Sequence, residues 1–246
     1  AEVVAMGTAL RLIHQPAAGT DNIDLEAARA RGIPVCNTPA RNHVALAETA
    51  LMLMLMLARR WKLTSQRFGE AVIGEPLGME LRGKTLGIVG MGKSGSALAT
   101  TAEAMGMRVL GLRSASGDEA WETLLAEADV ISLHCPLRPE STNLFDRRRF
   151  QRCKPGVYFI NCARAGLVDE DALVWALDEG PVAGAAIDHH WQEPWDPDKP
   201  LYHREDVIVT PHIGGSSREA FARVAECVVD NVEALLEGRE LSNRVA

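Results

Sequence analysis

Residues 87–98 read GIVGMGKSGSAL, a stretch that fits two glycine signatures for different ligands. From Gly87 it matches G-x-x-x-x-G-K-S, the phosphate loop of nucleotide hydrolases, and from Gly90 it matches G-x-G-x-x-G, the dinucleotide fingerprint. A phosphate loop needs an apolar strand before its first glycine, but the preceding GMELRGKTL is polar, and the apolar run 86–89 ends at Gly90. A hydrolase would also place a magnesium-binding aspartate after a second strand, whereas Asp129 precedes the strand in ADVISLHC. We therefore interpret the stretch as a dinucleotide loop and the hydrolase match as a coincidence of spacing.

Each glycine of this loop then has its own reason. Gly90 makes the tight turn, Gly92 lets the backbone approach a pyrophosphate, and Gly95 lets the helix pack on the strand. The pyrophosphate is expected at the helix N-terminus, where backbone N–H groups attract anions. Lys93 and Ser94 lie between these glycines, and we expect them to bind the cofactor too.

Short apolar runs alternate with helix-like stretches along the whole chain, without hairpin turns. This pattern predicts an α/β fold with a doubly wound parallel sheet, covered by helices on both faces. We expect strands at 10–14, 33–36, 85–89, 108–112, 130–133, 157–161, 183–188 and 207–210, and helices at 24–31, 94–105, 118–128, 169–179 and 217–237.

An apolar helix expected at 44–61 separates two strands from six, and a loop rich in glycine is expected at 65–83. The apolar segment of this helix, ALMLMLMLA, has nine residues, whereas a membrane span needs roughly 20. We expect this helix to be buried, at a domain or subunit contact. The predicted domains are a small lobe at 1–40, a dinucleotide-binding domain at 41–215, and a C-terminal helix at 216–246 that returns to the small lobe.

Charge and cysteine content narrow the class of protein. The 246 residues include 33 acidic and 26 basic side chains, a net charge of -7, which argues against a nucleic-acid partner. We expect no membrane association. The five scattered cysteines, with no C-x-x-C pair, indicate reduced thiols in the cytoplasm and no metal site.

The strand at 108–112 bears on the choice of dinucleotide. NAD sites place an acidic residue near the end of the second strand, where it binds the ribose 2'-hydroxyl. Here Arg113 and Ser114 stand at that point. A guanidinium would attract a 2'-phosphate, so we expect NADP(H) to be preferred, with NAD(H) possible; the alternative is a solvated arginine at a strand end.

Three polar residues follow three later strands: Arg164, Glu193 and His212. Singly, each is an ordinary loop residue. Because ligands bind outside the carboxyl ends of parallel strands, we expect them at one rim. There they would supply a cation for a substrate carboxylate, and an imidazole proton donor oriented by a carboxylate.

The chain resembles the D-isomer-specific 2-hydroxyacid dehydrogenases, including the glyoxylate and hydroxypyruvate reductases. The resemblance implies two lobes with a catalytic cleft, a homodimer built around the dinucleotide-binding domain, and a small-molecule 2-oxo or 2-hydroxy acid as substrate. It covers essentially the whole chain, through QPAAGTDNIDLEAARARGIPVCNTP (15–39), NHVALAE (42–48), GIVGMGKSG, SLHCPLRPESTNLF (132–145), NCARAGLVDEDAL (161–173), DHHWQEP (188–194) and TPHIGG (210–215).

The resemblance also implies roles by position. Arg164 would orient the 2-oxo acid, and His212, held by Glu193, would protonate its oxygen during hydride transfer. The backbone at Ala18 and Gly19 matches the loop that binds the substrate carboxylate. Asp188 matches the aspartate that holds the nicotinamide carboxamide, and the remaining positions assigned to the cofactor are Cys135, Pro136 and Cys162.

Three departures from the family pattern stand out, one of which is Arg113 in place of the acidic residue discussed above. The family's chains are usually longer, so we expect part of the small flavodoxin-like lobe to be absent. His189 and His190 stand where the family usually has a small apolar and then an aromatic residue, which we interpret as a packing variation, not a shared metal site. A dinucleotide-binding regulatory or scaffold protein on the same fold is the alternative function.

Overall fold

The structure is a computed structural model that describes residues 2–20 and 22–246, so Ala1 and Asp21 of the expected small lobe lie outside the described residues. It divides into two compact units. One comprises the chain up to Ala45 together with Ser216–Ala246, and the other is Leu46–Gly215. The division falls inside helix α3 (His43–Ala58), a little after the expected boundary at 40 and 41.

The larger unit is built on a parallel six-stranded sheet of order β4-β3-β5-β6-β7-β8. This confirms the predicted α/β fold with a parallel sheet. The chain winds outward in both directions from β3 and β5, so the topological switch point, where such sheets bind ligands, lies between these two strands. The strands are β3 (Thr85–Val89), β4 (Arg108–Leu112), β5 (Val130–Leu133), β6 (Val157–Asn161), β7 (Val182–Ile187) and β8 (Val207–Val209).

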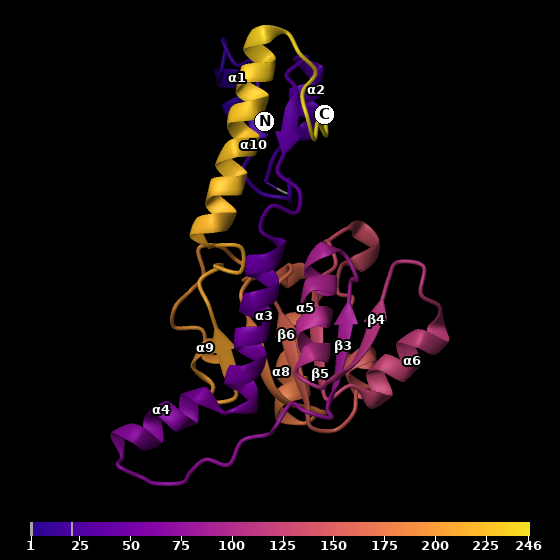
Figure 1. Cartoon of the computed structure of the whole chain (residues 1–246), viewed down its shortest axis with the longest axis vertical. Coiled ribbons are helices and arrows are strands. Elements are labelled where there is room, and N and C mark those ends of the chain that lie inside the picture. The colour runs from indigo at the N-terminus through magenta and orange to yellow at the C-terminus, as the bar shows by residue number, and fades with distance from the viewer. Residues whose placement is uncertain (1, 21) are drawn as a thin grey trace. The chain divides into compact units, whose positions relative to one another are not determined.

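Helices cover both faces of this sheet. Helices α3 and α5 (Lys93–Ala104) pack together on one face (Figure 1). The other face holds Phe145, Phe150 and Phe159, whose ring centroids lie 4.9–5.4 Å apart. Burial on both faces explains why the inner strands are apolar throughout instead of alternating, whereas the edge strand β4 is partly exposed. The helices packed on this second face are α6 (Asp118–Glu127), α7 (Arg147–Gln151) and α8 (Glu170–Asp178).

The helix expected at 44–61 is shorter than predicted. Helix α3 ends at Ala58, Arg60 adopts a left-handed conformation with φ of 50°, and a second helix, α4 (Trp61–Gly69), follows. The beginning of the loop expected at 65–83 is therefore helical. Helix α3 is also not buried on every side within the single chain, because Met52 and Leu55 are exposed.

The smaller unit pairs β1 (Ile13–Gln15) with β2 (Val35–Asn37) in parallel. The C-terminal residues join β2, because Val35 N–H donates to Ala246 O at 3.0 Å and Asn37 N–H donates to Asn243 O at 3.1 Å. The unit also contains α1 (Glu2–Met6), α2 (Leu25–Ala30) and α10 (Arg218–Glu237).

Short polar side chains fix where several helices begin. Asp24, Asp169 and Ser217 accept from backbone N–H groups in the first turns of α2, α8 and α10, as N-cap residues do. Over the described residues, no helix has both the length and the apolar character needed to cross a membrane. The remaining elements are the short helices η1 (Pro139–Ser141), η2 (Ala165–Leu167) and α9 (Pro200–His203).

Candidate active site

The glycine loop forms an open cradle at the N-terminus of α5. Gly90 has φ of +110°, and a Cβ there would lie 2.5 Å from Cys135 N; a Cβ on Gly95 would lie 2.3 Å from Gly90 O. Side chains are thus excluded at both positions. A Cβ on Gly92, the N-cap of α5, would meet none of the described atoms within 4 Å. The open space and the N–H groups of the first helical turn fit an anionic pyrophosphate.

The other residues predicted from this loop lie around the cradle. Lys93 and Ser94 begin α5, and Cys135 and Pro136 follow β5. The Ser94 hydroxyl lies 3.2 Å from His134 Nδ1, and His134 Nε2 lies 3.0 Å from Ser132 Oγ. Burial lowers the pKa of His134 to about 4, so this imidazole is neutral near pH 7. His134, which the sequence motifs did not single out, supports Ser94 through its ring.

Arg113 reaches back to the glycine loop from the end of β4. Its Nη1 donates to Met91 O at 2.7 Å, and its backbone N–H donates to Ser116 Oγ at 2.9 Å. The adjacent Ser114 is exposed.

Cys162, another predicted cofactor contact, is 1% exposed and packs in the core beneath α3 and α5. Its thiol therefore faces the protein interior, and only its backbone remains as a predicted cofactor contact.

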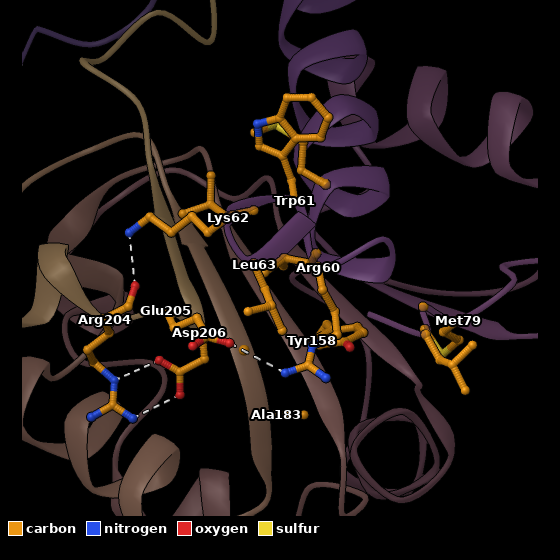
Figure 2. A pocket seen from close by; sticks show the side chains of 16 residues that line it. Arg60, Trp61, Lys62, Leu63, Met79, Tyr158, Ala183, Arg204, Glu205 and Asp206 are labelled. Carbon is orange, nitrogen blue, oxygen red and sulfur yellow. Dashed lines mark hydrogen bonds and ion pairs between the residues drawn. The ribbon is translucent and has the colours of Figure 1, made fainter. Parts of the chain in front are cut away.

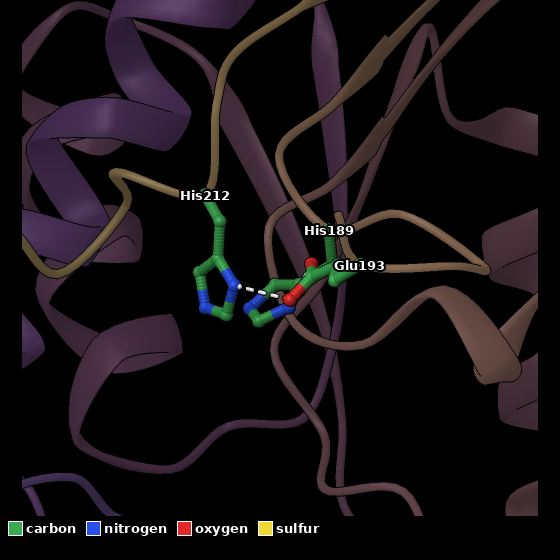
Figure 3. A group of neighbouring side chains, drawn as sticks. All are labelled: His189, Glu193 and His212. Atoms are coloured by element: carbon green, nitrogen blue, oxygen red, sulfur yellow. Dashed lines mark hydrogen bonds and ion pairs between the residues drawn. The ribbon is translucent and has the colours of Figure 1, made fainter. Parts of the chain in front are cut away.

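Glu193 and His212 form the central pair of the candidate active site. His212 Nδ1 donates to Glu193 Oε2 at 2.9 Å, and Figure 3 shows the two side chains directed toward each other. His212 has φ of 54°, an uncommon conformation outside glycine. Burial opposes ionisation of Glu193, but hydrogen bonds from His190 N–H and from His212 outweigh it and lower the pKa of this carboxyl. Glu193 is thus a carboxylate that holds the His212 ring by its Nδ1.

Asp188 fixes the loop that carries His212. Its fully buried carboxylate accepts from Thr210 Oγ1 at 2.6 Å, from Ile213 N–H at 2.8 Å and from Gly214 N–H at 2.7 Å. These bonds join the end of β7 to the loop after β8, on both sides of His212. The contacts give Asp188 a structural role that the sequence did not suggest; its role toward a nicotinamide carboxamide stays a prediction.

Arg164 is presented by a turn at the end of β6. The buried Asn161 holds this turn, because its amide donates to Arg164 O at 2.8 Å and its Oδ1 accepts from Ala163 N–H at 3.0 Å. The Arg164 guanidinium donates through Nη1 to Ala163 O at 2.7 Å and to His189 Nε2 at 3.2 Å. Asn161 was also missed from sequence, although an asparagine at the end of an apolar strand is a signal for a local backbone turn.

The two adjacent histidines contact different groups. His190 lies between Trp195 and Tyr202 and bonds to Thr210 O through Nε2 at 3.0 Å. The interpretation of His189 as a packing variation is wrong, since its ring bonds to Arg164 and lies 3.7 Å, between centroids, from the His212 ring. His189 thus places ring nitrogens beside Arg164 and His212 in the candidate site.

Distance alone would let these side chains hold a metal. His189, Glu193 and His212 offer ligand atoms within 4.8 Å of one another. However, Nε2 of His189 already accepts from the Arg164 guanidinium, and His212 Nδ1 is paired with Glu193. A metal ion bound to the His189 ring would have to displace the Arg164 guanidinium, which is already bonded to that ring. We therefore assign no metal to these side chains.

Ala18 and Gly19, the expected carboxylate-binding loop, lie in the smaller unit. Asn37 donates to Ala18 O at 2.7 Å, and Thr38 N–H donates to Ala17 O at 2.9 Å. The loop is therefore fixed within its own unit by the last residue of β2 and the residue after it. Its role toward substrate stays a prediction.

A cavity of about 770 Å³ lies elsewhere in the larger unit, between α3, α4 and the amino ends of β6–β8. Figure 2 shows Lys62 and Arg60 at its wall near Arg204, Glu205 and Asp206. Since the candidate catalytic residues follow the carboxyl ends of the strands, this cavity lies at the opposite ends of the strands and is separate from the candidate active site.

Comparison with known proteins agrees with the motifs. Residues 51–214 match the family described as D-isomer specific 2-hydroxyacid dehydrogenase, NAD binding domain. The D-3-phosphoglycerate dehydrogenase of Archaeoglobus fulgidus is 37% identical over 257 residues, covering 100% of this chain and 49% of that protein. This chain thus spans about half the length of the curated relatives it matches.

Solved structures give the same result. The D-lactate dehydrogenase from Aquifex aeolicus, complexed with NAD and lactic acid, is 31% identical with a TM-score of 0.88, covering 99% of this chain and 82% of that one. A glyoxylate reductase from Paecilomyes thermophila is 33% identical with a TM-score of 0.86, covering 99% and 78%. Because the matched region runs from α3 to the loop of His212, the chain belongs to the D-isomer specific 2-hydroxyacid dehydrogenase family.

Proposed function

We propose that the full-length protein is an oxidoreductase that transfers a hydride between a nicotinamide dinucleotide and a small 2-oxo acid or its D-2-hydroxy counterpart. The observation that carries this proposal is the 2.9 Å hydrogen bond between His212 Nδ1 and Glu193 Oε2. It leaves Nε2 of His212 available to exchange a proton, and Arg164 bonds to His189, beside the same ring.

Each residue has a defined part in the reaction. The glycine cradle at Gly90, Gly92 and Gly95 would hold the dinucleotide, which when bound would supply or accept the hydride. His212 donates its Nε2 proton to the oxygen on C2 of the substrate during reduction, and takes it back during oxidation. Glu193 stabilises the imidazolium form that donates this proton. The Arg164 guanidinium binds and orients the substrate carboxylate.

NADP(H) is the proposed preferred cofactor, with NAD(H) as the second. The support is Arg113, which directly follows β4 and whose guanidinium donates to Met91 O. An acidic residue at this position would repel a 2'-phosphate. Steady-state kinetics of the wild type and of Arg113→Asp test this. We expect a higher kcat/KM with NADPH for the wild type and a fall of at least tenfold with NADPH in the variant; equal or better wild-type efficiency with NADH would contradict the preference.

Glyoxylate or hydroxypyruvate is the proposed substrate. The assay is oxidation of NADPH and NADH by the full-length protein with glyoxylate, hydroxypyruvate, pyruvate and 3-phosphohydroxypyruvate, the last because phosphoglycerate dehydrogenases are among the relatives. Turnover of one of these acids is expected. Tight dinucleotide binding without turnover of any of these acids would instead favour a regulatory or scaffold role.

The proposed cellular setting is the reduced cytoplasm. The five free cysteines support it.

A homodimer is proposed through α3, α4 and the segment after α4. Large apolar side chains are exposed there: Phe68 is 88%, Ile73 97% and Leu77 86% exposed. Monomers rarely expose such groups together, and they are typical of protein interfaces. Sedimentation velocity should give a dimer for the wild type and a monomer for the Phe68→Glu/Ile73→Glu double variant. A monomeric wild type at micromolar concentration would contradict this.

A further inference from the structure

His189 is a buried histidine in contact with all three candidate catalytic residues. It is 7% exposed. Its Nε2 lies 3.2 Å from Arg164 Nη1, its Nδ1 lies 3.7 Å from Glu193 Oε1, and its ring lies 3.7 Å from the His212 ring. Figure 3 shows the His189 ring beside the Glu193 carboxylate.

The partner at Nε2 fixes the tautomer of this ring. A guanidinium has only donors, so the His189 nitrogen that faces Arg164 must accept and carries no proton. The ring proton is then on Nδ1, on the side of the Glu193 carboxylate. Burial, together with the neighbouring His212 and Arg164, lowers the pKa of His189 to about 3, which agrees with a neutral ring.

We propose that His189 is a positioning residue, whose Nε2 orients the Arg164 guanidinium toward the substrate carboxylate. The inference rests on the proposed function, because it assigns a role within that reaction. An apolar residue at position 189 could fill the same space, but it could not accept a hydrogen bond. Arg164 would then keep its bond to Ala163 O and lose its bond to His189, which lies beside Glu193 and His212.

Two amide substitutions separate the two ring nitrogens. In His189→Gln the amide oxygen can reach the place of Nε2 and accept from Arg164, whereas in His189→Asn the shorter amide reaches only the place of Nδ1. We expect His189→Asn to raise KM for the 2-oxo acid about tenfold, with kcat reduced less than threefold. His189→Gln should keep KM within about threefold of the wild type. Unfolding midpoints and the Kd for the dinucleotide are measured for both variants, and should agree between them.

A double-mutant cycle with Arg164→Lys shows whether the effect passes through the guanidinium. In the Arg164→Lys background, His189→Asn should change KM less than twofold. An equal rise in KM for the Asn and Gln variants, or the same effect of His189→Asn in both backgrounds, would overturn the positioning role. If Arg164→Lys itself leaves KM unchanged, it is the proposed function of Arg164 that fails.

One further readout needs no turnover. Long-range proton–nitrogen correlation spectra of the full-length protein, labelled with nitrogen-15 histidine, should show His189 with its proton on Nδ1 at pH 7. Arg164→Lys should shift the Nε2 resonance of His189 and leave that of His203 unchanged. A proton on Nε2 of His189 at pH 7 would overturn the inference, whatever the protein catalyses.

Discussion

Replacing Asp188 by asparagine tests how the site is held together. The carboxylate receives one hydroxyl and two backbone N–H donors from the loop that carries His212, at 2.6–2.8 Å, and it is fully buried. Asparagine has almost the same shape, so packing is kept. The asparagine amide has one oxygen and one NH2 group, however, and the NH2 group cannot accept a hydrogen bond from a backbone N–H.

The cost follows from these three contacts. Hydrogen bonds to charged groups contribute about 1.5–3 kcal/mol each, and a buried donor left without an acceptor costs about 1–3 kcal/mol. With one oxygen kept and at least one N–H facing the new amino group, we expect Asp188→Asn to lower the free energy of unfolding by about 2–4 kcal/mol. For a chain of this size that corresponds to a fall in Tm of roughly 4–16 °C. Displacement of His212 by about 1 Å would lower kcat about a hundredfold.

Urea unfolding followed by circular dichroism measures the first effect without any assumption about the reaction. Asp198→Asn is the matched control, because Asp198 is exposed and the chemical change is the same. The control should unfold within about 0.5 kcal/mol of the wild type. If Asp188→Asn were as stable as this control and kept full turnover, the reasoning that Asp188 fixes the His212 loop would be refuted.

Three further outcomes are expected. The pKa of His134 is lowered to about 4 by burial, while an unfolded histidine titrates near 6.5. The unfolded chain then binds more protons below pH 6.5, so stability falls as the pH drops from 6.5 toward 4, by up to about 1.4 kcal/mol per pH unit for this group. His134→Gln should flatten that part of the stability profile, and identical slopes would contradict this. Gly92→Ala should fold normally but bind the dinucleotide at least tenfold more weakly by calorimetry, whereas Gly95→Ala, with Gly90 O at 2.3 Å, should lose stability itself; the opposite ranking would argue against the cradle. Asn161→Ala should destabilise the protein by about 1–3 kcal/mol and raise KM for the 2-oxo acid, because the turn that presents Arg164 loses two bonds; an unchanged KM would argue against that role.

Apolar patterning predicted the six strands of the large sheet closely, because the strands inside the sheet are covered on both faces. The strand order was not predictable from the pattern, since it depends on which way each crossover turns. The boundary between α3 and α4 was missed for a local reason. Arg60 adopts a left-handed conformation, which a sequence usually signals by a glycine, and position 60 is not glycine. Helix α4 is also polar and buries little besides Leu63, so it has no clear apolar pattern.

From the sequence, the candidate site residues could be predicted only from their position after the carboxyl ends of the parallel strands. Glu193 and His212 could be named in this way, and the structure brings them within hydrogen-bonding distance. What the sequence could not provide is the set of contacts across loops. The bonds from Asp188 to the His212 loop and from Arg164 to His189 join segments 22–26 and 25 positions apart. Their partners depend on side-chain directions that only the folded chain defines.

Turnover of His212→Gln most directly tests whether the imidazole held by Glu193 is the proton donor. NADPH oxidation is measured at saturating 2-oxo acid, with His203→Gln as the matched control, because His203 lies on α9 and bonds to Pro197 O. We predict that His212→Gln lowers kcat by about 10²- to 10⁴-fold while dinucleotide affinity and Tm stay at wild-type values and the control keeps full activity. Wild-type kcat in the His212→Gln variant would contradict the proposed reaction.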